Sequence, residues 1–107
     1  MMKKKILLAL VASSMLVTWV AQSQDSGQAM SLMLKGQTLN QQGRHEEAVP
    51  VLQHAVRLSP SEIFGRNQLG LALIKTNKPE EALLQFIQVL ELDPKNFFAR
   101  AWIKKIM

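Results

Sequence analysis

The stretch that decides the fold is residues 63–94, IFGRNQLGLALIKTNKPEEALLQFIQVLELDP. Moved back by 34 positions, it lies over residues 29–60, AMSLMLKGQTLNQQGRHEEAVPVLQHAVRLSP. The identical residues that then coincide are Gly36 and Gly70, Leu39 and Leu73, Glu46 and Glu80, Glu47 and Glu81, Ala48 and Ala82, Leu58 and Leu92, and Pro60 and Pro94. A fixed period of 34 residues is the length of a helix–turn–helix repeat.

The spacing of apolar and small residues indicates that each unit holds two helices. Ala48, Leu52 and Ala55 recur at three- and four-residue intervals, which is helical periodicity. Gly43 and Asn77 are suited to the left-handed conformation that ends a helix, and Pro79 follows where a helix can start. We expect an all-α fold with helices at 27–42, 45–58, 60–75, 79–92 and 95–106.

The junctions between units also contain helix-start signals. Ser59-Pro60-Ser61-Glu62 has the form of a capping box, with Ser59 as N-cap and Glu62 three residues later. Asp93-Pro94 repeats the N-cap and the proline. We therefore predict that helices begin directly at Pro60 and just after Pro94.

Small residues within the predicted helices have a packing explanation. Gly36 and Gly70 lie in the first helix of each unit, where they let a second helix approach closely. Leu52 and Phe86 supply bulk on that second helix. Helical hairpins of this kind stack on one another to bury a continuous core.

Residues 1–23 have the three parts of a secretory signal peptide: a positive start, an apolar run from Ile6 to Val20, and a small and polar end. The run would make roughly 22 Å of helix, against a hydrocarbon core of about 30 Å. We expect cleavage after Ser23 and less readily after Ala21. The alternatives are an uncleaved membrane anchor and a buried first helix of the domain.

Composition excludes several classes of protein. The 107 residues include no cysteine, so disulfide frameworks, thiolate metal sites and cysteine nucleophiles are excluded. The net charge is +5, but beyond residue 23 the chain has 10 basic against 8 acidic residues. No basic stripe interleaved with aromatic residues is left, which argues against nucleic-acid binding.

The repeated residues resemble the tetratricopeptide repeat (TPR) family. The second unit matches the family pattern best, with Leu69-Gly70, Ala82, Phe86 and Pro94. The resemblance implies a short right-handed α-solenoid of two tandem TPR hairpins and a C-terminal capping helix. The boundaries that we predict are a signal peptide at 1–23, a linker at 24–28, TPR units at 29–62 and 63–96, and the capping helix at 97–107.

The resemblance also implies a concave groove, lined by the first helix of each unit, that binds a peptide or protein segment. The residues carried over to this groove are Met30, Met33, Gln37, Asn40, Gln41, Phe64, Asn67, Leu71, Ile74 and Lys75. Met33 and Gln37 stand where a basic clamp for acidic tails would need a lysine and an asparagine. We therefore expect an apolar or amphipathic ligand, with side-chain amides to hold its backbone. Met30 and Met33 can equally serve as binding surface or fill gaps between helices.

Catalytic and metal-binding constellations are weak in this sequence. His45 and His54, nine residues apart on one predicted helix, point to nearly opposite faces. The Glu46-Glu47 and Glu80-Glu81 pairs lie in first turns of helices, where negative charge complements the helix dipole. We predict no enzyme activity, no cofactor and no metal, and keep a hydrolase using His45 or His54 as an alternative.

The C-terminal stretch contains more large apolar residues than one buried stripe needs. A homodimer through Phe98, Trp102 and Ile106 is our first structural expectation. For function, we predict an exported, periplasmic or secreted scaffold or adaptor that binds another protein. The alternative is an assembly chaperone or accessory subunit anchored in the inner membrane.

Overall fold

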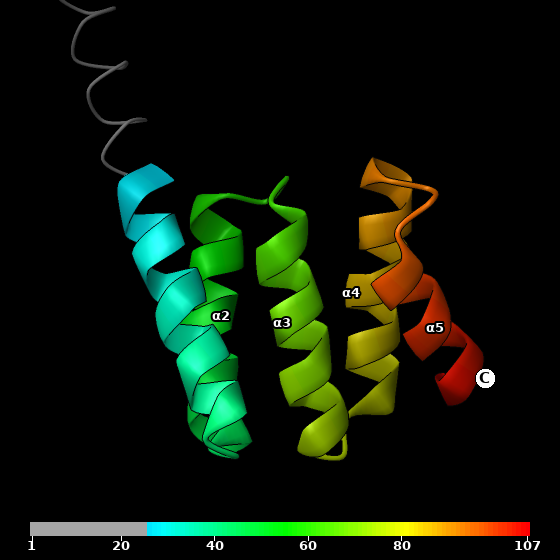
Figure 1. Cartoon of the computed structure of the whole chain (residues 1–107), viewed down its shortest axis with the longest axis horizontal. Helices are drawn as coiled ribbons and strands as arrows, with labels where there is room; N and C mark the ends of the chain where they lie inside the picture. Colours follow the sequence, from blue (N-terminus) through cyan, green and yellow to red (C-terminus); the bar gives the residue numbers. More distant parts are fainter. Residues whose placement is uncertain (1–25) are drawn as a thin grey trace, which may run out of the picture.

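The computed structural model describes residues 26–107, so the predicted signal peptide lies outside the described residues. This part of the chain is all-α: it forms five helices and no strand (Figure 1). The helices are residues 26–41, α2 (His45–Leu58), α3 (Ile63–Lys75), α4 (Pro79–Leu92) and α5 (Phe97–Ile106). Residues 26–28 of the predicted linker belong to the first of them.

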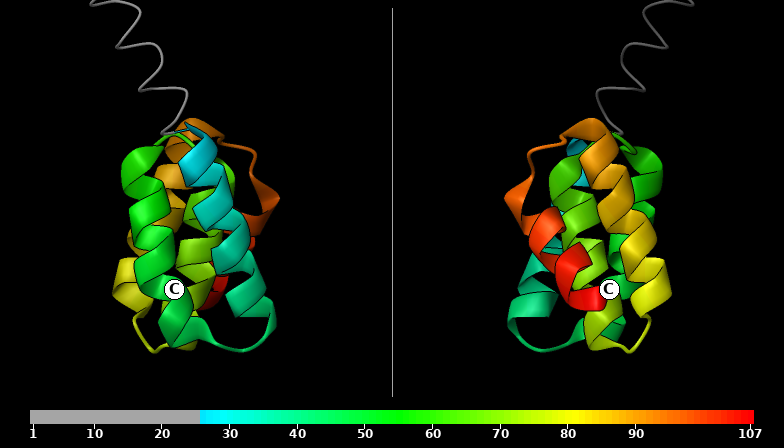
Figure 2. Two further views of the ribbon diagram at one scale, coloured as in Figure 1. Left: turned by 90° about the vertical axis from the view of Figure 1, so that its left-hand side faces the viewer. Right: turned by 90° about the vertical axis from the view of Figure 1, so that its right-hand side faces the viewer.

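The helices form antiparallel hairpins that stack side by side in two layers. The 26–41 helix, α3 and α5 make one layer, and α2 and α4 make the other (Figures 1 and 2). Contacts run between consecutive helices, from α2 to α3, from α3 to α4 and from α4 to α5. Within residues 26–107, no helix is both long enough and apolar enough to cross a bilayer.

The two turns inside the hairpins confirm the sequence prediction. Gly43 has φ of 77° and Asn77 has φ of 65°, both in the left-handed region. Pro79 occupies the first turn of α4, where its missing N–H costs nothing. The boundaries of α2 and α4 agree with the predicted ranges 45–58 and 79–92.

The predicted starts of the other two helices were wrong. Ser59 ends α2, and its carbonyl accepts a hydrogen bond from the Glu62 N–H at 3.3 Å, so residues 59–62 form a turn and no capping box. Asp93 likewise ends α4, and its carbonyl accepts from the Asn96 N–H at 3.0 Å. A proline at the second position of such a turn is as favourable as one at the start of a helix. Helices α3 and α5 consequently begin at residues 63 and 97.

Asn96, three residues beyond the predicted cap Asp93, is the true N-cap of α5. Its Oδ1 accepts a hydrogen bond from the Ala99 N–H at 3.0 Å. This bond satisfies one of the free donors at the start of the helix.

The core is organised around two glycines. Gly36 lies directly beneath the Leu52 side chain, and Gly70 lies beneath the Phe86 ring. Both large side chains are fully buried. Phe86 also stacks on Trp102, with ring planes 4° apart and centroids 6.3 Å apart, and meets the edge of Phe98. Phe86 therefore joins α3 and α5 to α4.

Replacing Gly70 by alanine is expected to destabilise the protein. The new Cβ would lie 2.5 Å from Cζ of Phe86, a ring that cannot withdraw because Trp102 stacks on it. Overpacking of this kind costs about 1–3 kcal/mol, against a gain of about 1 kcal/mol from better helix propensity. Chemical denaturation followed by circular dichroism measures the difference.

Gly27→Ala is the matched control, because nothing lies within 4 Å of its Cβ position. We expect its stability to be unchanged or slightly higher. A Gly70→Ala protein as stable as the original would contradict the role given to the Phe86 contact.

Candidate functional site

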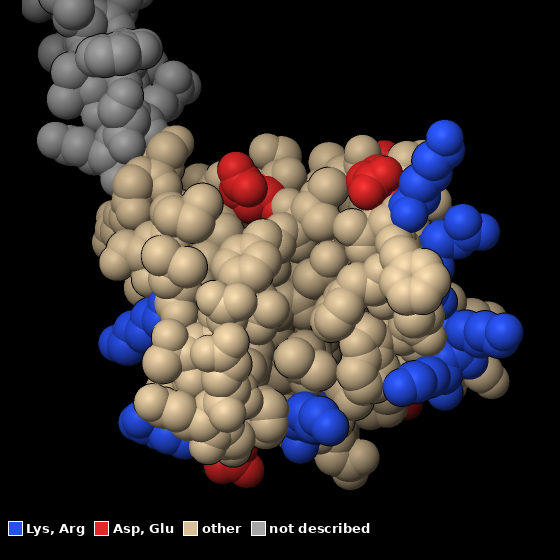
Figure 3. All heavy atoms as spheres, viewed as in Figure 1, with Lys and Arg blue, Asp and Glu red and all other residues tan. Residues whose placement is uncertain are grey.

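The layer made by residues 26–41, α3 and α5 forms the face shown in Figure 3, which we call the front face. Helical spacing assigns one stripe of residues, at equivalent positions, to each of these three helices. Residues at i, i+4, i+7 and i+11 of a helix share one side of it. The stripes lie 34 residues apart and consist of Met30, Leu34, Gln37 and Gln41; Phe64, Gln68, Leu71 and Lys75; and Phe98, Trp102 and Lys105.

Most of the predicted groove residues are accessible. Met30, Gln41 and Lys75 are exposed, while Gln37, Phe64, Asn67, Leu71 and Ile74 are partly exposed. Ile74 also packs against the main core, and Phe64 packs against a smaller cluster made by Ala29, Met33 and Ala55. These residues leave part of their side chains available on the surface.

Met33 does not lie on the surface. Its side chain is 1% exposed and packs between Ala29 and Ala55. Its sulfur lies against the backbone of Gly65, where a Cβ would be only 3.2 Å away. The absence of a side chain at Gly65 lets Met33 turn inward, so it fills the joint between the first helix and α3. The sequence left open whether Met33 is part of a binding surface or fills a gap between helices, and its burial favours the second.

Asn40 is also inside the structure and serves as a polar tie between units. Its Nδ2 donates to the backbone carbonyl of Gln68 at 3.0 Å and to Oε1 of the same residue at 3.1 Å. Its Oδ1 is paired with Nδ1 of His45 at 2.9 Å. A 7% exposed amide with these partners holds the first helix to α3 and α2, and is not free to bind a ligand.

Asn67 makes a similar tie further along the stack. Its Nδ2 donates to Oδ1 of Asn96 at 3.4 Å, which connects α3 to the N-cap of α5. Its own Oδ1 is buried and has no hydrogen-bond partner among residues 26–107. The amide therefore acts mainly within the fold.

Two apolar residues of the front face were missed by the groove prediction. Leu34 is exposed and lies one helical turn from Met30. Phe98 is 38% exposed and continues the same surface onto α5. Four-residue spacing from Met30 and 34-residue spacing from Phe64 are the sequence signals that could have identified them.

The residues of the predicted homodimer are largely engaged within the chain. Trp102 and Ile106 pack against the main core, and the ring of Phe98 meets those of Phe86 and Trp102. Lys105 lies over the Trp102 ring, with Nζ 4.9 Å from its centroid. The homodimer through these residues stays a prediction, with less free apolar surface than the sequence indicated.

The middle of the front face is uncharged. Figure 3 shows lysine, arginine and acidic side chains toward its edges and none across its centre. Lys75 and Lys105, the two basic residues of the stripes, lie in the last turns of α3 and α5. The centre of the face thus offers apolar side chains and amides to a ligand, and the stripes carry positive charge only in the last turns of α3 and α5.

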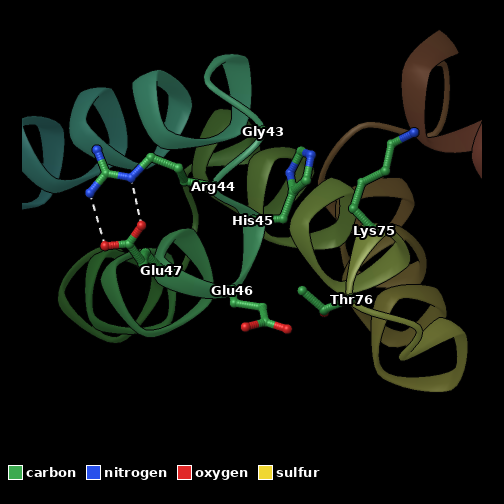
Figure 4. A pocket seen from close by; sticks show the side chains of 7 residues that line it. All are labelled: Gly43, Arg44, His45, Glu46, Glu47, Lys75 and Thr76. Carbon is green, nitrogen blue, oxygen red and sulfur yellow. Dashed lines mark hydrogen bonds and ion pairs between the residues drawn. The ribbon is translucent and has the colours of Figure 1, made fainter.

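A hollow of about 500 Å³ lies at the turn between the first helix and α2 (Figure 4). Two of its charged groups are paired with each other: Arg44 donates to Glu47 at 2.5 and 2.9 Å, on the side away from Lys75 and Thr76. This bond lowers the pKa of the exposed Glu47 carboxyl and raises the pKa of Arg44. The contribution of this ion pair to folding stability is present when the pH lies above the ordinary pKa of a glutamate. It is lost as the pH falls through the lowered pKa of Glu47.

The hollow does not resemble a catalytic centre. His45 lines it but is paired with Asn40, and Glu46 stands in the first turn of α2. Among the residues that the structure describes, no group of three or more His, Asp or Glu side chains is placed to hold a metal ion. The front face is the better candidate for function.

The family model of the tetratricopeptide repeat matches residues 29–62 and 66–96, which is more than half of the chain. The chain belongs to the TPR family. Two TPR units and the α5 helix therefore account for the whole described fold, and the 34-residue period is that of the TPR hairpin. TPR units are protein–protein interaction modules and are typically non-catalytic.

Solved structures show the same TPR arrangement. The first TPR of Spaghetti (RPAP3), bound to the HSP90 peptide SRMEEVD, is 25% identical with a TM-score of 0.50. The similarity covers 76% of this chain and 94% of that chain. The first TPR domain of human RPAP3 is 24% identical with a TM-score of 0.51, over 76% and 91% of the two chains. No curated protein sequence matches this TPR chain.

The two methionines of the first TPR unit are expected to behave differently when truncated. Met33→Ala should destabilise the protein by about 2–5 kcal/mol, because it leaves a cavity between the first helix and α3. Met30→Ala removes a 46% exposed side chain and should change stability by about 0.5 kcal/mol or less. Urea denaturation of the two variants measures both effects, and equal losses would contradict the inward placement of Met33.

Proposed function

We propose that this TPR protein is exported and acts in the periplasm or at the cell envelope as a scaffold or adaptor. Its front face would hold an apolar or amphipathic segment of another protein. The observation that carries the proposal is the uncharged centre of the front face, to which exposed Met30 and Leu34 and the partly exposed Phe64, Leu71 and Phe98 contribute apolar surface. An apolar surface that runs over three helices of one layer is typical of protein-binding sites.

The chemistry of the stripes indicates what the ligand needs. Met30 and Leu34 are flexible or branched aliphatic side chains that adapt to apolar groups of different shapes. Gln37, Gln41 and Gln68 place amides along the same stripes, where each can donate to and accept from a peptide backbone. A segment with spaced apolar residues and an accessible backbone satisfies both requirements.

A strongly acidic peptide is a poor match. The peptide bound by the Spaghetti TPR, SRMEEVD, contains three acidic residues. On the front face of this chain, the basic residues of the stripes lie in the last turns of α3 and α5, and none lies in the centre. Carboxylates laid across the apolar centre would lose water without gaining a partner there.

Export rests on the sequence of residues 1–23. A positive start, an apolar run and the small residues Ala21 and Ser23 favour a cleaved signal peptide. The second candidate is an assembly chaperone or accessory subunit of an envelope complex that keeps the run from Ile6 to Val20 as a membrane anchor. The length of that run, short for a bilayer, favours the exported form.

The mass of the protein separates these two candidates. We expect the protein purified from its producing cells to lack residues 1–23 and to begin at Gln24. Intact-mass spectrometry of periplasmic and membrane fractions makes the measurement. A full-length protein confined to the membrane fraction would replace the exported scaffold by the anchored form.

Photo-cross-linking in cells tests the binding face. A photoreactive residue at position 71, on the central stripe, is expected to capture a foreign protein through an apolar segment, which peptide mapping identifies. Leu34→Glu in the same chain should reduce the captured amount by about tenfold or more, because it places a charge on the apolar surface.

The controls use positions away from the front face. Gln28→Glu adds the same charge on another side of the first helix and should leave capture unchanged. A photoreactive residue at Gln53, exposed on α2, should not capture the same protein. Equal capture from positions 53 and 71, or capture of an acidic segment, would refute binding of an apolar segment at this face.

A further inference from the structure

A basic hollow lies beside α5, away from the front-face stripe of that helix. It has a volume of about 390 Å³ and is lined by Lys95, Phe97, Arg100, Ala101 and Lys104. Phe97 is 84% exposed, which is the strongest exposure of an aromatic side chain among the described residues. The sequence from residue 94 to residue 107 has four basic residues and no acidic one. The hollow is thus an apolar floor with a positively charged rim.

The repeat shows what this side of a helix receives. Phe97, Arg100 and Lys104 correspond, 34 residues earlier, to Ile63, Arg66 and Gly70 of α3. On α3 this side is covered by α4.

The contacts of α3 with α4 show how each position is used. Arg66 donates to Oε1 of Gln85 at 3.0 Å and also to Gln88, while Gly70 admits the Phe86 ring. The α5 hollow therefore corresponds to the side of α3 on which α4 packs. Arg100 corresponds to Arg66, which donates to the glutamine side chains of α4.

One substitution changes the kind of helix that fits. Lys104 replaces the glycine that lets Phe86 approach α3, so a helix docked on α5 must stand farther away. It would then meet the ammonium group of Lys104 as well as the guanidinium of Arg100. A helix with carboxylates beside an apolar centre is the complementary partner.

The outer side of α4 has this composition. Leu84 and Ile87 are 60% and 41% exposed, and Glu80 and Glu91 flank them on the same side of the helix. The corresponding residues of α2 are Glu46, Pro50, Gln53 and Arg57. Since α2 folds with a proline and a glutamine there, the fold itself does not require the apolar pair on α4.

We propose that the outer side of α4 in one copy of the protein docks on the α5 hollow of a second copy. Leu84 and Ile87 cover Phe97 and Ala101, and the flanking carboxylates of Glu80 and Glu91 face the basic rim. The two surfaces differ, so the contact is heterologous. In every pair of copies, one α4 surface and one α5 hollow therefore stay unoccupied.

This arrangement avoids the charge conflict of a homodimer in which two α5 hollows face each other. Such a dimer would bring Arg100 and Lys104 of both copies together, and like charges across an interface oppose association. The proposed contact instead pairs a basic rim with an acidic one. The proposed contact also leaves the front face free. An experiment that disproves this contact would therefore leave the proposed binding function untouched, and the reverse also holds.

Disulfide trapping tests the contact, because the full chain has no cysteine of its own. Ile87→Cys in one copy and Ala101→Cys in another, both full-length, are mixed under mild oxidation. We expect a heterodimer that forms about tenfold faster than with Gln53→Cys and Ala101→Cys, the matched pair from α2. The rate should fall at high salt because the rim contacts are electrostatic.

Charge reversal gives an independent readout. Glu80→Lys with Glu91→Lys in the Ile87→Cys chain should slow trapping about tenfold. Arg100→Glu with Lys104→Glu in the Ala101→Cys chain should restore it. These are exposed positions, so circular dichroism should show intact helices in every variant.

Four results would overturn the proposal, three of them in the trapping experiment itself. These three are trapping no faster than the Gln53 control, trapping unaffected by charge reversal, and preferential formation of Ala101→Cys homodimers. If the chain is untrapped and instead sediments with phosphatidylglycerol vesicles through Arg100 and Lys104, the basic rim belongs to the membrane surface and the proposal is refuted.

Discussion

The close approach of two helices at Gly70 is the contact on which the rest of the structure depends. Because glycine has no side chain, the Phe86 ring of α4 lies directly on the α3 backbone. The same ring stacks on Trp102, so the position of α5 follows from it. Gly36 and Leu52 repeat this contact in the first TPR unit, and together the two sites set the spacing of the layers.

Polar ties then fix how the units sit on each other. Asn40 joins the first unit to Gln68 of the second, and Arg66 reaches from α3 to Gln85 of α4 and to the carbonyl of Pro60. These bonds are directional, so they form only when the helices keep one register. The buried amide of Asn40 finds its hydrogen-bond partners in only one arrangement of the helices, so it specifies how the two TPR units stack. The front face has its form because α3 is held in this register.

The chemistry of the surface divides between two sides of the same helices. The front-face stripes are apolar and rich in amides, whereas the other exposed side of α5 carries cations and Phe97. Helix α4 adds a third surface, with Leu84 and Ile87 exposed between carboxylates. A small TPR stack thus carries three surfaces of different chemistry, and the front face proposed for a bound segment does not overlap the two surfaces proposed for contact between copies.

The sequence by itself determined the helical hairpins and their order, because the 34-residue period, Gly43, Asn77 and Pro79 act through local backbone geometry. It misplaced the starts of α3 and α5, since Ser59-Pro60 and Asp93-Pro94 suit a turn as well as a cap, and the choice depends on where the preceding helix ends. The resemblance to the TPR family supplied several of the front-face residues, but Leu34, Gln68 and the residues of α5 were not among them. The inward turn of Met33 and the internal role of Asn40 were decided only by tertiary structure: both depend on α3, where Gly65 leaves space and Gln68 supplies the partner. Periodicity assigns a residue to a side of its own helix, whereas burial depends on what the neighbouring helix places opposite it.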